Sequence, residues 1–200
     1  MTTIVIVSKD ANGLSINNFK TVDDRRISQL NFENVEIDAD QIVATGDEAE
    51  QLIKDAINYG TLCISAEAVG CMESCYLKTV DYTKSREQFG QPISNFQVLQ
   101  HKMVDMFIEA ELCKSLLYKS MIDMHENNDS KYRSVSALKS QVGSSGKKVG
   151  EDAVQLHGGM GVSEEMSIGH YLKRFISIDS QFGNSHFHLS LIHISEPTRR

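Results

Sequence analysis

Two short segments of the sequence carry residues that could do chemistry beyond helix packing. One is Arg86-Glu-Gln-Phe-Gly-Gln-Pro-Ile-Ser-Asn-Phe-Gln97, and the other is Gln155-Leu-His-Gly-Gly-Met-Gly161. A guanidinium offers planar, paired donors that stay charged, and glycine lets a backbone approach a ligand where a Cβ would obstruct it. Taken singly, each segment also has a plain structural interpretation, a loop with an aromatic plug and a helix cap with a flexible turn. The glycines do not match the Gly-Lys-Ser/Thr ending of a phosphate loop.

The cysteines and histidines do not form a recognisable metal site. Cys71 and Cys75 lie on one face of an expected helix, but no second pair stands at zinc-ligand spacing, and Cys63 and Cys113 are isolated. We therefore expect reduced, mostly buried thiols. A di-metal carboxylate bundle would need Glu-x-x-His pairs on facing helices, and none occurs at that spacing. The sequence predicts no metal.

Composition narrows the class of protein further. A net charge of −7 over 200 residues argues against nucleic-acid binding, which usually shows a clustered basic excess. No apolar run approaches the roughly 20 residues of a transmembrane helix, and the N-terminus lacks the basic and apolar regions of a signal peptide. The sequence contains only 2 prolines, which favours long helices. We expect a soluble, acidic, mainly α-helical protein.

The spacing of apolar residues predicts four helices that position these segments. They are expected over residues 47–84, from 94 or 95 through 121, over 132–156 and over 166–178. Gly143, Gly146 and Gly150 recur at spacings of three and four, which predicts close approach of another helix. Four helices with modest connections are typical of an up-and-down four-helix bundle.

The first 45 residues have a different pattern, which predicts three short strands at 3–7, 26–32 and 34–37. Three strands alone would leave unprotected sheet edges. This region is therefore interpreted as the last few strands of a β domain whose beginning is missing.

In this order and at this separation, the two segments resemble the acyl-CoA dehydrogenase family, flavoproteins that oxidise acyl-CoA thioesters at the α and β carbons. They match its Arg-x-Gln-Phe-Gly…Phe-Gln and Gln-x-x-Gly-Gly-x-Gly motifs, and Tyr82 and Tyr171-Leu-Lys-Arg174 add to the agreement. The resemblance covers about residues 3–188. It implies a fragment with the end of the middle β domain (1–45) and the C-terminal bundle domain (46–188). Residues 189–200 resemble a translated sequencing adapter and are expected to be a non-native tail.

The resemblance implies that this chain contacts FAD across a subunit boundary. The residues carried over from the two motifs are Arg86, Gln88, Phe89, Gln97, Gln155, Gly158 and Gly159. In this scheme Arg86 and Gln88 contact the cofactor, and Phe89 packs on its adenosine half. The glycines admit the backbone to the adenine and the pyrophosphate. The implied partners are an acyl-CoA substrate, further copies or a second subunit in an oligomer built as a dimer of dimers, and an electron-accepting flavoprotein.

The family's catalytic glutamate has no counterpart here. Phe182 stands where many relatives carry it, and Gly60 stands at a second family location. We therefore assign no catalytic residue. The parent is expected to be an FAD-dependent acyl-CoA dehydrogenase of the bacterial cytoplasm, or of the mitochondrial matrix if eukaryotic. The alternative is a non-catalytic partner subunit of a heteromeric enzyme.

Overall fold

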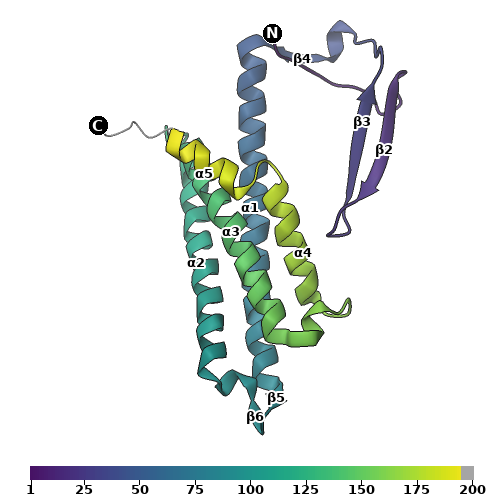
Figure 1. Cartoon of the computed structure of the whole chain (residues 1–200). Coiled ribbons are helices and arrows are strands. Elements are labelled where there is room, and N and C mark those ends of the chain that lie inside the picture. The colour runs from purple at the N-terminus through teal and green to yellow at the C-terminus, as the bar shows by residue number, and fades with distance from the viewer. Residues whose placement is uncertain (195–200) are drawn as a thin grey trace. The chain divides into compact units, whose positions relative to one another are not determined.

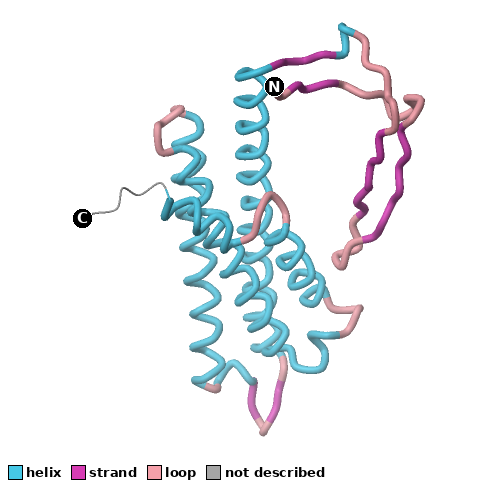
Figure 2. The backbone as a smooth tube through the Cα atoms, turned by 45° about the horizontal axis from the view of Figure 1, so that its top comes forward, coloured by secondary structure: helices cyan, strands magenta, loops and turns pink. Residues whose placement is uncertain are grey.

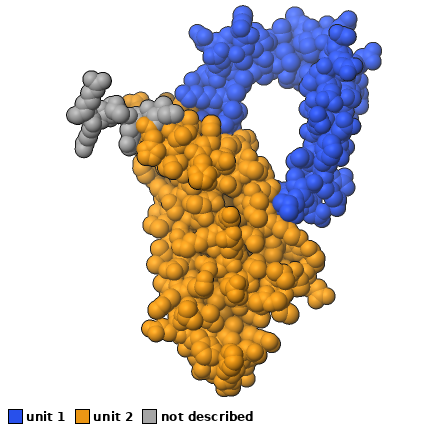
Figure 3. Space-filling model, viewed as in Figure 1, with its two compact units in different colours: residues 1–59 blue, residues 60–200 orange. Residues whose placement is uncertain are grey.

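The computed structural model of the protein describes residues 1–194, with side chains described through residue 193. The chain divides into two compact units, residues 1–59 and 60–200 (Figure 3). Helix α1 (Gly46–Ser85) contributes its first residues to one unit and its remainder to the other. The expected domain limits of 1–45, 46–188 and 189–200 remain predictions.

The larger unit is built from long helices packed antiparallel (Figures 1 and 2). After α1 come α2 (Gln97–His125), α3 (Lys131–His157) and α4 (Ser167–Ser180). The expectation of four helices in an up-and-down bundle is confirmed. Each helix has an apolar stripe at helical spacing, and packing side by side buries these stripes against one another. A further helix, α5 (Ser185–Ile194), was not expected, and the last six residues of the expected non-native tail lie outside the described residues.

The core of the bundle takes residues from each of its four long helices. Its members are Ile64, Ala68, Val69, Met72, Cys75, Met106, Ala110, Cys113, Leu117, Leu138, Val142, Val149, Ala153, Leu156, Ile168, Phe175 and Ile178. Burial raises the pKa of the Cys75 thiol to about 12 and that of Cys113 to about 11, which agrees with unreactive packing thiols.

No described helix is both long enough and apolar enough to cross a bilayer.

The glycines of α3 meet the helix that follows them. A Cβ on Gly146 would lie 3.0 Å from the Phe175 ring, and one on Gly150 would lie 3.0 Å from both Leu172 and Phe175. A Cβ on Gly143 would lie 2.1 Å from the Asp179 carboxylate. The predicted close approach at this strip of glycines is confirmed, and α4 is the helix that makes it.

Short antiparallel pairs make up the strands of the smaller unit. β1 (Thr3–Val5) pairs with β4 (Ile42–Thr45), and β2 (Leu14–Lys20) pairs with β3 (Arg26–Phe32). A 3-10 turn, η1 (Ala39–Gln41), precedes β4.

The strand expected at 34–37 is wrong. Asn34 has a φ of 51°, a left-handed conformation that ends the extended backbone. The strands at 14–20 and 42–45 were not expected.

Candidate functional site

The two segments singled out in the sequence meet at one end of the bundle. α1 ends there and is followed by the hairpin of β5 (Glu87–Gln88) and β6 (Gln91–Pro92) and the turn η2 (Ile93–Asn95). α3 ends there too, in the turn η3 (Gly158–Val162), as Figure 1 shows. Between them lies a pocket of about 510 Å³, lined by Tyr82, Arg86, Gln88, Ile93, Gln155, Leu156, His157, Gly158, Gly159 and Met160.

Arg86 supplies a cation to this pocket. Its backbone is held on both sides, because its N–H donates to the Tyr82 carbonyl at 2.9 Å and its carbonyl accepts from the Ile93 N–H at 2.8 Å. Its side chain is exposed and makes no ion pair with any residue in the described part of the chain. A fixed backbone carrying an uncommitted guanidinium is suited to a phosphate group.

Gly158 gives the pocket a backbone wall. Its φ of 59° and ψ of −140° lie in a region that only glycine populates readily, and its N–H donates to the Gln155 carbonyl. A Cβ on Gly158 or Gly159 would meet no atom within 4 Å. The space above both residues is therefore open to a ligand.

Five of the seven expected cofactor-binding residues line this pocket: Arg86, Gln88, Gln155, Gly158 and Gly159. Phe89 does not. It sits at the tip of the β5–β6 hairpin with a φ of 55°, is 92% exposed and makes an edge contact with Phe96. Gln97, the first residue of α2, is exposed and also lies outside the pocket lining.

The pocket contains a contact that sequence reasoning did not predict. The Tyr82 ring of α1 stacks on the His157 ring at the end of α3, with centroids 4.1 Å apart and an interplanar angle of 20°. The Tyr82 hydroxyl also lies 3.4 Å from the His157 carbonyl. Both residues flank the motifs in the sequence, but nothing in their spacing shows that two positions 75 residues apart would meet.

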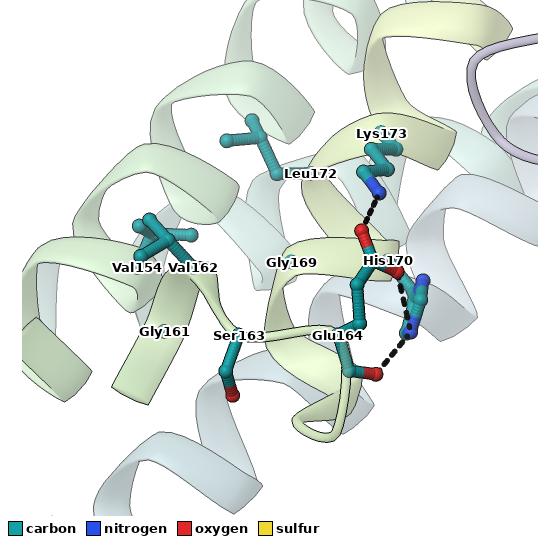
Figure 4. A pocket seen from close by; sticks show the side chains of 9 residues that line it. All are labelled: Val154, Gly161, Val162, Ser163, Glu164, Gly169, His170, Leu172 and Lys173. Atoms are coloured by element: carbon teal, nitrogen blue, oxygen red, sulfur yellow. Dashed lines mark hydrogen bonds and ion pairs between the residues drawn. The ribbon is translucent and has the colours of Figure 1, made fainter. Parts of the chain in front are cut away.

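A second, smaller hollow lies along η3 and α4 (Figure 4). Its volume is about 170 Å³, and Val154, Val162 and Leu172 give it an apolar lining. At its rim the Glu164 carboxylate accepts from Lys173 Nζ at 2.7 Å. This hollow is too small for a dinucleotide, and its nearest charges are already paired.

The two positions that lack the family glutamate contact each other. The Phe182 ring packs on the bare backbone of Gly60, where a Cβ would come within 2.7 Å of the ring. Phe182 has a φ of 57° in the turn between α4 and α5. No carboxylate stands at either position, so the structure supplies no catalytic base there.

Lys139 of α3 donates hydrogen bonds to the backbone of the end of α4 and of this turn. Its fully buried ammonium donates to the backbone carbonyls of Ile178 at 3.0 Å and of Asp179 and Gly183 at 2.9 Å. His188 Nε2 lies 2.9 Å from the Phe182 carbonyl. The turn that carries Phe182 is therefore fixed by two buried side chains.

Glu67, a carboxylate on α1, is engaged elsewhere. Arg174 donates two hydrogen bonds to the Glu67 carboxylate, from Nε to Oε1 at 2.8 Å and from Nη2 to Oε2 at 2.7 Å. Among the described residues, no group of three or more His, Cys, Asp and Glu side chains could hold a metal ion.

Comparison with known proteins decides the family. Residues 51–195 match the family model described as acyl-CoA dehydrogenase, C-terminal domain. The chain belongs to the acyl-CoA dehydrogenase family. It is 27% identical over 146 residues to the short-chain specific acyl-CoA dehydrogenase of Megasphaera elsdenii, covering 72% of this chain and 38% of that protein. Against an acyl-CoA dehydrogenase of Bacillus subtilis it is 29% identical over 146 residues, covering 73% and 38%.

Solved structures share the fold of this chain. Butyryl-CoA dehydrogenase from Megasphaera elsdenii superposes with a TM-score of 0.90 at 22% identity, covering 96% of this chain and 51% of that one. The ChsE4–ChsE5 complex from Mycobacterium tuberculosis gives a TM-score of 0.89 at 22% identity, covering 98% and 53%. The chain thus spans about half the length of the matched chains in these two solved structures, and 38% of the two sequence relatives above.

Proposed function

We propose that this chain is part of an FAD-dependent acyl-CoA dehydrogenase subunit, which removes hydrogen from the α and β carbons of an acyl-CoA thioester. One observation carries the proposal. The Arg86 and Gly158 segments, 72 residues apart, line a single pocket with an uncommitted guanidinium and an open glycine wall. The family membership gives that pocket its chemical meaning.

The residues present fit the dinucleotide part of FAD. Arg86 would pair with the pyrophosphate, since a guanidinium can offer two parallel N–H donors to phosphate oxygens. The amides of Gln88 and Gln155 would supply donors and acceptors at its edges. The turn at Gly158 and Gly159 would let the backbone approach closely. When bound, FAD supplies the hydride-accepting chemistry, while this chain binds and orients it.

The exposed face of α2 supports the proposal that the subunit works in an oligomer. Val104, Ile108, Leu112, Tyr118 and Ile122 lie at helical spacing and are each between 46% and 56% exposed. An apolar stripe of this kind is typical of a protein–protein interface. We propose a homo- or hetero-oligomer, a dimer of dimers, in which this pocket serves a neighbouring subunit's cofactor.

The remaining assignments follow from the family. We propose an acyl-CoA substrate, an electron-accepting flavoprotein as partner, and a bacterial cytoplasmic or mitochondrial matrix location. The alternative of a non-catalytic partner subunit is not favoured, because the sequence relatives matched are themselves named as dehydrogenases. The catalytic base stays unassigned.

An Arg86 series tests the pocket. Arg86→Gln is expected to weaken FAD binding roughly 10- to 100-fold, because a charge-assisted bidentate contact is lost. The FAD affinity of Arg86→Lys is expected to lie between those of the wild type and Arg86→Gln. A lysine ammonium keeps the positive charge but lacks the two parallel N–H donors of a guanidinium. The measurement is the quenching of FAD fluorescence as FAD is titrated with the full-length parent protein. For a heteromeric enzyme, the parent is expressed together with its partner subunit. Lys84→Gln, which removes an exposed cation outside the pocket lining, is the matched control.

Two outcomes would count against the proposal. One is equal weakening by Arg86→Gln and Lys84→Gln, which would mean that only net charge matters. The other is a parent protein that carries no flavin alone or with its partner subunit. A bound flavin whose absorbance is bleached by an acyl-CoA thioester would support the dehydrogenase activity itself.

A further inference from the structure

The stacked pair Tyr82–His157 is the aromatic contact between the two motif-bearing segments of the pocket. Tyr82 lies one helical turn before Arg86 and accepts that residue's backbone N–H at 2.9 Å. His157 directly precedes Gly158, which begins the glycine turn. A shift between these two rings would therefore move Arg86 relative to the glycine wall.

His157 is held rigidly from its own side. The residue is 3% exposed, and its Nδ1 lies 2.8 Å from the Ala153 carbonyl one turn back on α3. A carbonyl can only accept, so Nδ1 carries the proton. Burial lowers the pKa of His157 below its ordinary value, which keeps the ring neutral near pH 7. The ring therefore has one fixed tautomer and one fixed orientation against Tyr82.

We infer that Tyr82 and His157 are positioning residues of this pocket, whose stack sets the separation between the Arg86 guanidinium and the Gly158–Gly159 turn. The assignment of the pocket to FAD rests on the proposed function, whereas the positioning itself does not. A pocket arranged before the ligand arrives binds more tightly, because less ordering is left to be done on binding.

The same helix offers a matched control. Tyr76, six residues before Tyr82 on α1, is also half-buried and also makes an aromatic contact, with Phe107 of α2 at 5.7 Å. It packs against the bundle core and does not line the pocket. Tyr76→Leu and Tyr82→Leu thus each remove one aromatic contact from α1, but only the second touches the pocket.

Hydrogen exchange of the chain without cofactor tests the positioning directly. Tyr82→Leu is expected to speed exchange of the amides at residues 158–162 about five- to tenfold, the scale of one lost aromatic pair. Tyr76→Leu is expected to leave those amides unchanged. Tyr82→Phe keeps the ring stack but removes the hydroxyl that donates to the His157 carbonyl at 3.4 Å, so its exchange rate is expected to lie between those of the wild type and Tyr82→Leu. This variant should also retain the ring-current shift that Tyr82 imposes on the His157 ring protons.

FAD affinity of the full-length parent gives the second measurement. Tyr82→Leu is expected to weaken binding about five- to tenfold, while Tyr76→Leu is expected to match the wild type. Unchanged exchange at 158–162 in Tyr82→Leu would overturn the inference, as would equal effects of the two leucine variants. A wild-type parent that binds no FAD would refute the proposed function, and the exchange result would still decide the positioning.

Discussion

Lys139 is a charged side chain buried completely inside the bundle, where its ammonium donates to three backbone carbonyls. A buried ammonium is tolerated when acceptors replace the water it has lost. The three carbonyls belong to the end of α4 and the turn after it, where the helix leaves its last carbonyls without intrahelical donors, although Ile178 also accepts from the Gln181 N–H at 3.2 Å. The side chain therefore acts as an internal cap for α4.

Lys139→Met is expected to lower the free energy of unfolding by about 2–4 kcal/mol, because the carbonyls of Asp179 and Gly183 lose a charged donor and Ile178 keeps only the Gln181 N–H at 3.2 Å. Denaturant titration followed by circular dichroism measures the loss. Lys147→Met on the same helix removes an exposed lysine that faces Glu151 at 3.8 Å, and it should change stability by less than about 0.5 kcal/mol. A Lys139→Met protein as stable as Lys147→Met would refute the capping role.

His188 predicts a loss of stability in acid. Burial lowers the pKa of His188, and nearby Lys139 lowers it further, against the opposing effects of the Phe182 carbonyl and Asp179. Its Nδ1 is buried with no hydrogen-bond partner among the described residues, so protonation would bury an unpaired N–H. Below about pH 6.5 the unfolded chain takes up a proton that the folded chain resists, and stability falls as pH drops toward the folded pKa.

His188→Gln is expected to flatten this pH dependence, since a glutamine amide can still donate to the Phe182 carbonyl but does not titrate. Unfolding free energies at pH 7.5 and pH 5.5 measure the slope. His101→Gln, at an exposed position on α2, should leave the slope as it is. An identical slope in the wild type and in His188→Gln would show that another group governs the acid response.

The packing of α3 against α4 depends on glycine residues of α3, which have no side chain at the contact. Gly150→Ala is expected to destabilise the fold by about 1–3 kcal/mol, because the new Cβ would meet Leu172 and Phe175, including the Leu172 backbone at 3.2 Å. Gly70→Ala, in the middle of α1 with open space around it, is expected to stabilise by about 0.5–1 kcal/mol. Thermal unfolding of the two variants measures these opposite signs, and a shared sign would contradict the packing argument.

The helices were predictable from sequence because each long apolar stripe repeats many times, so one misread residue does not hide the period. The strands were less predictable from the sequence. Asn34-Val35-Glu36-Ile37 alternates like a strand but contains a left-handed residue, and Leu14–Lys20 carries two asparagines yet pairs with β3 in full register.

The sequence motifs predicted most of the residues that line one pocket, whereas their role in cofactor binding stays a prediction. Arg86, Gln155 and Gly158 were found by residue type and order, and the pocket brings them together. The Tyr82–His157 stack and the outward position of Phe89 were not predictable, since both depend on where distant backbone segments meet in space.

Over the whole chain, burial is uneven between the two units. Every residue of β3 and all but one of β2 are exposed, including Phe19 and Phe32. A two-stranded hairpin without cover is marginally stable in water. The bundle, by contrast, contains the continuous core described above.

Native-state hydrogen exchange of the 200-residue chain should therefore separate the units. Amides of residues 14–32 are expected to exchange at nearly unprotected rates, while core amides around Met72, Cys113 and Val149 are expected to be the slowest. Far-ultraviolet circular dichroism should meanwhile report retained helix. Strong protection across residues 14–32 would contradict this expectation and show that the hairpin is stable by itself.

The contact between Phe182 and Gly60 couples the evolution of two positions 122 residues apart. A side chain at position 60 would need volume that the aromatic ring at 182 already occupies, so that ring would have to move or be replaced by a smaller residue. Among relatives, the two positions are therefore expected to vary in opposite directions in size.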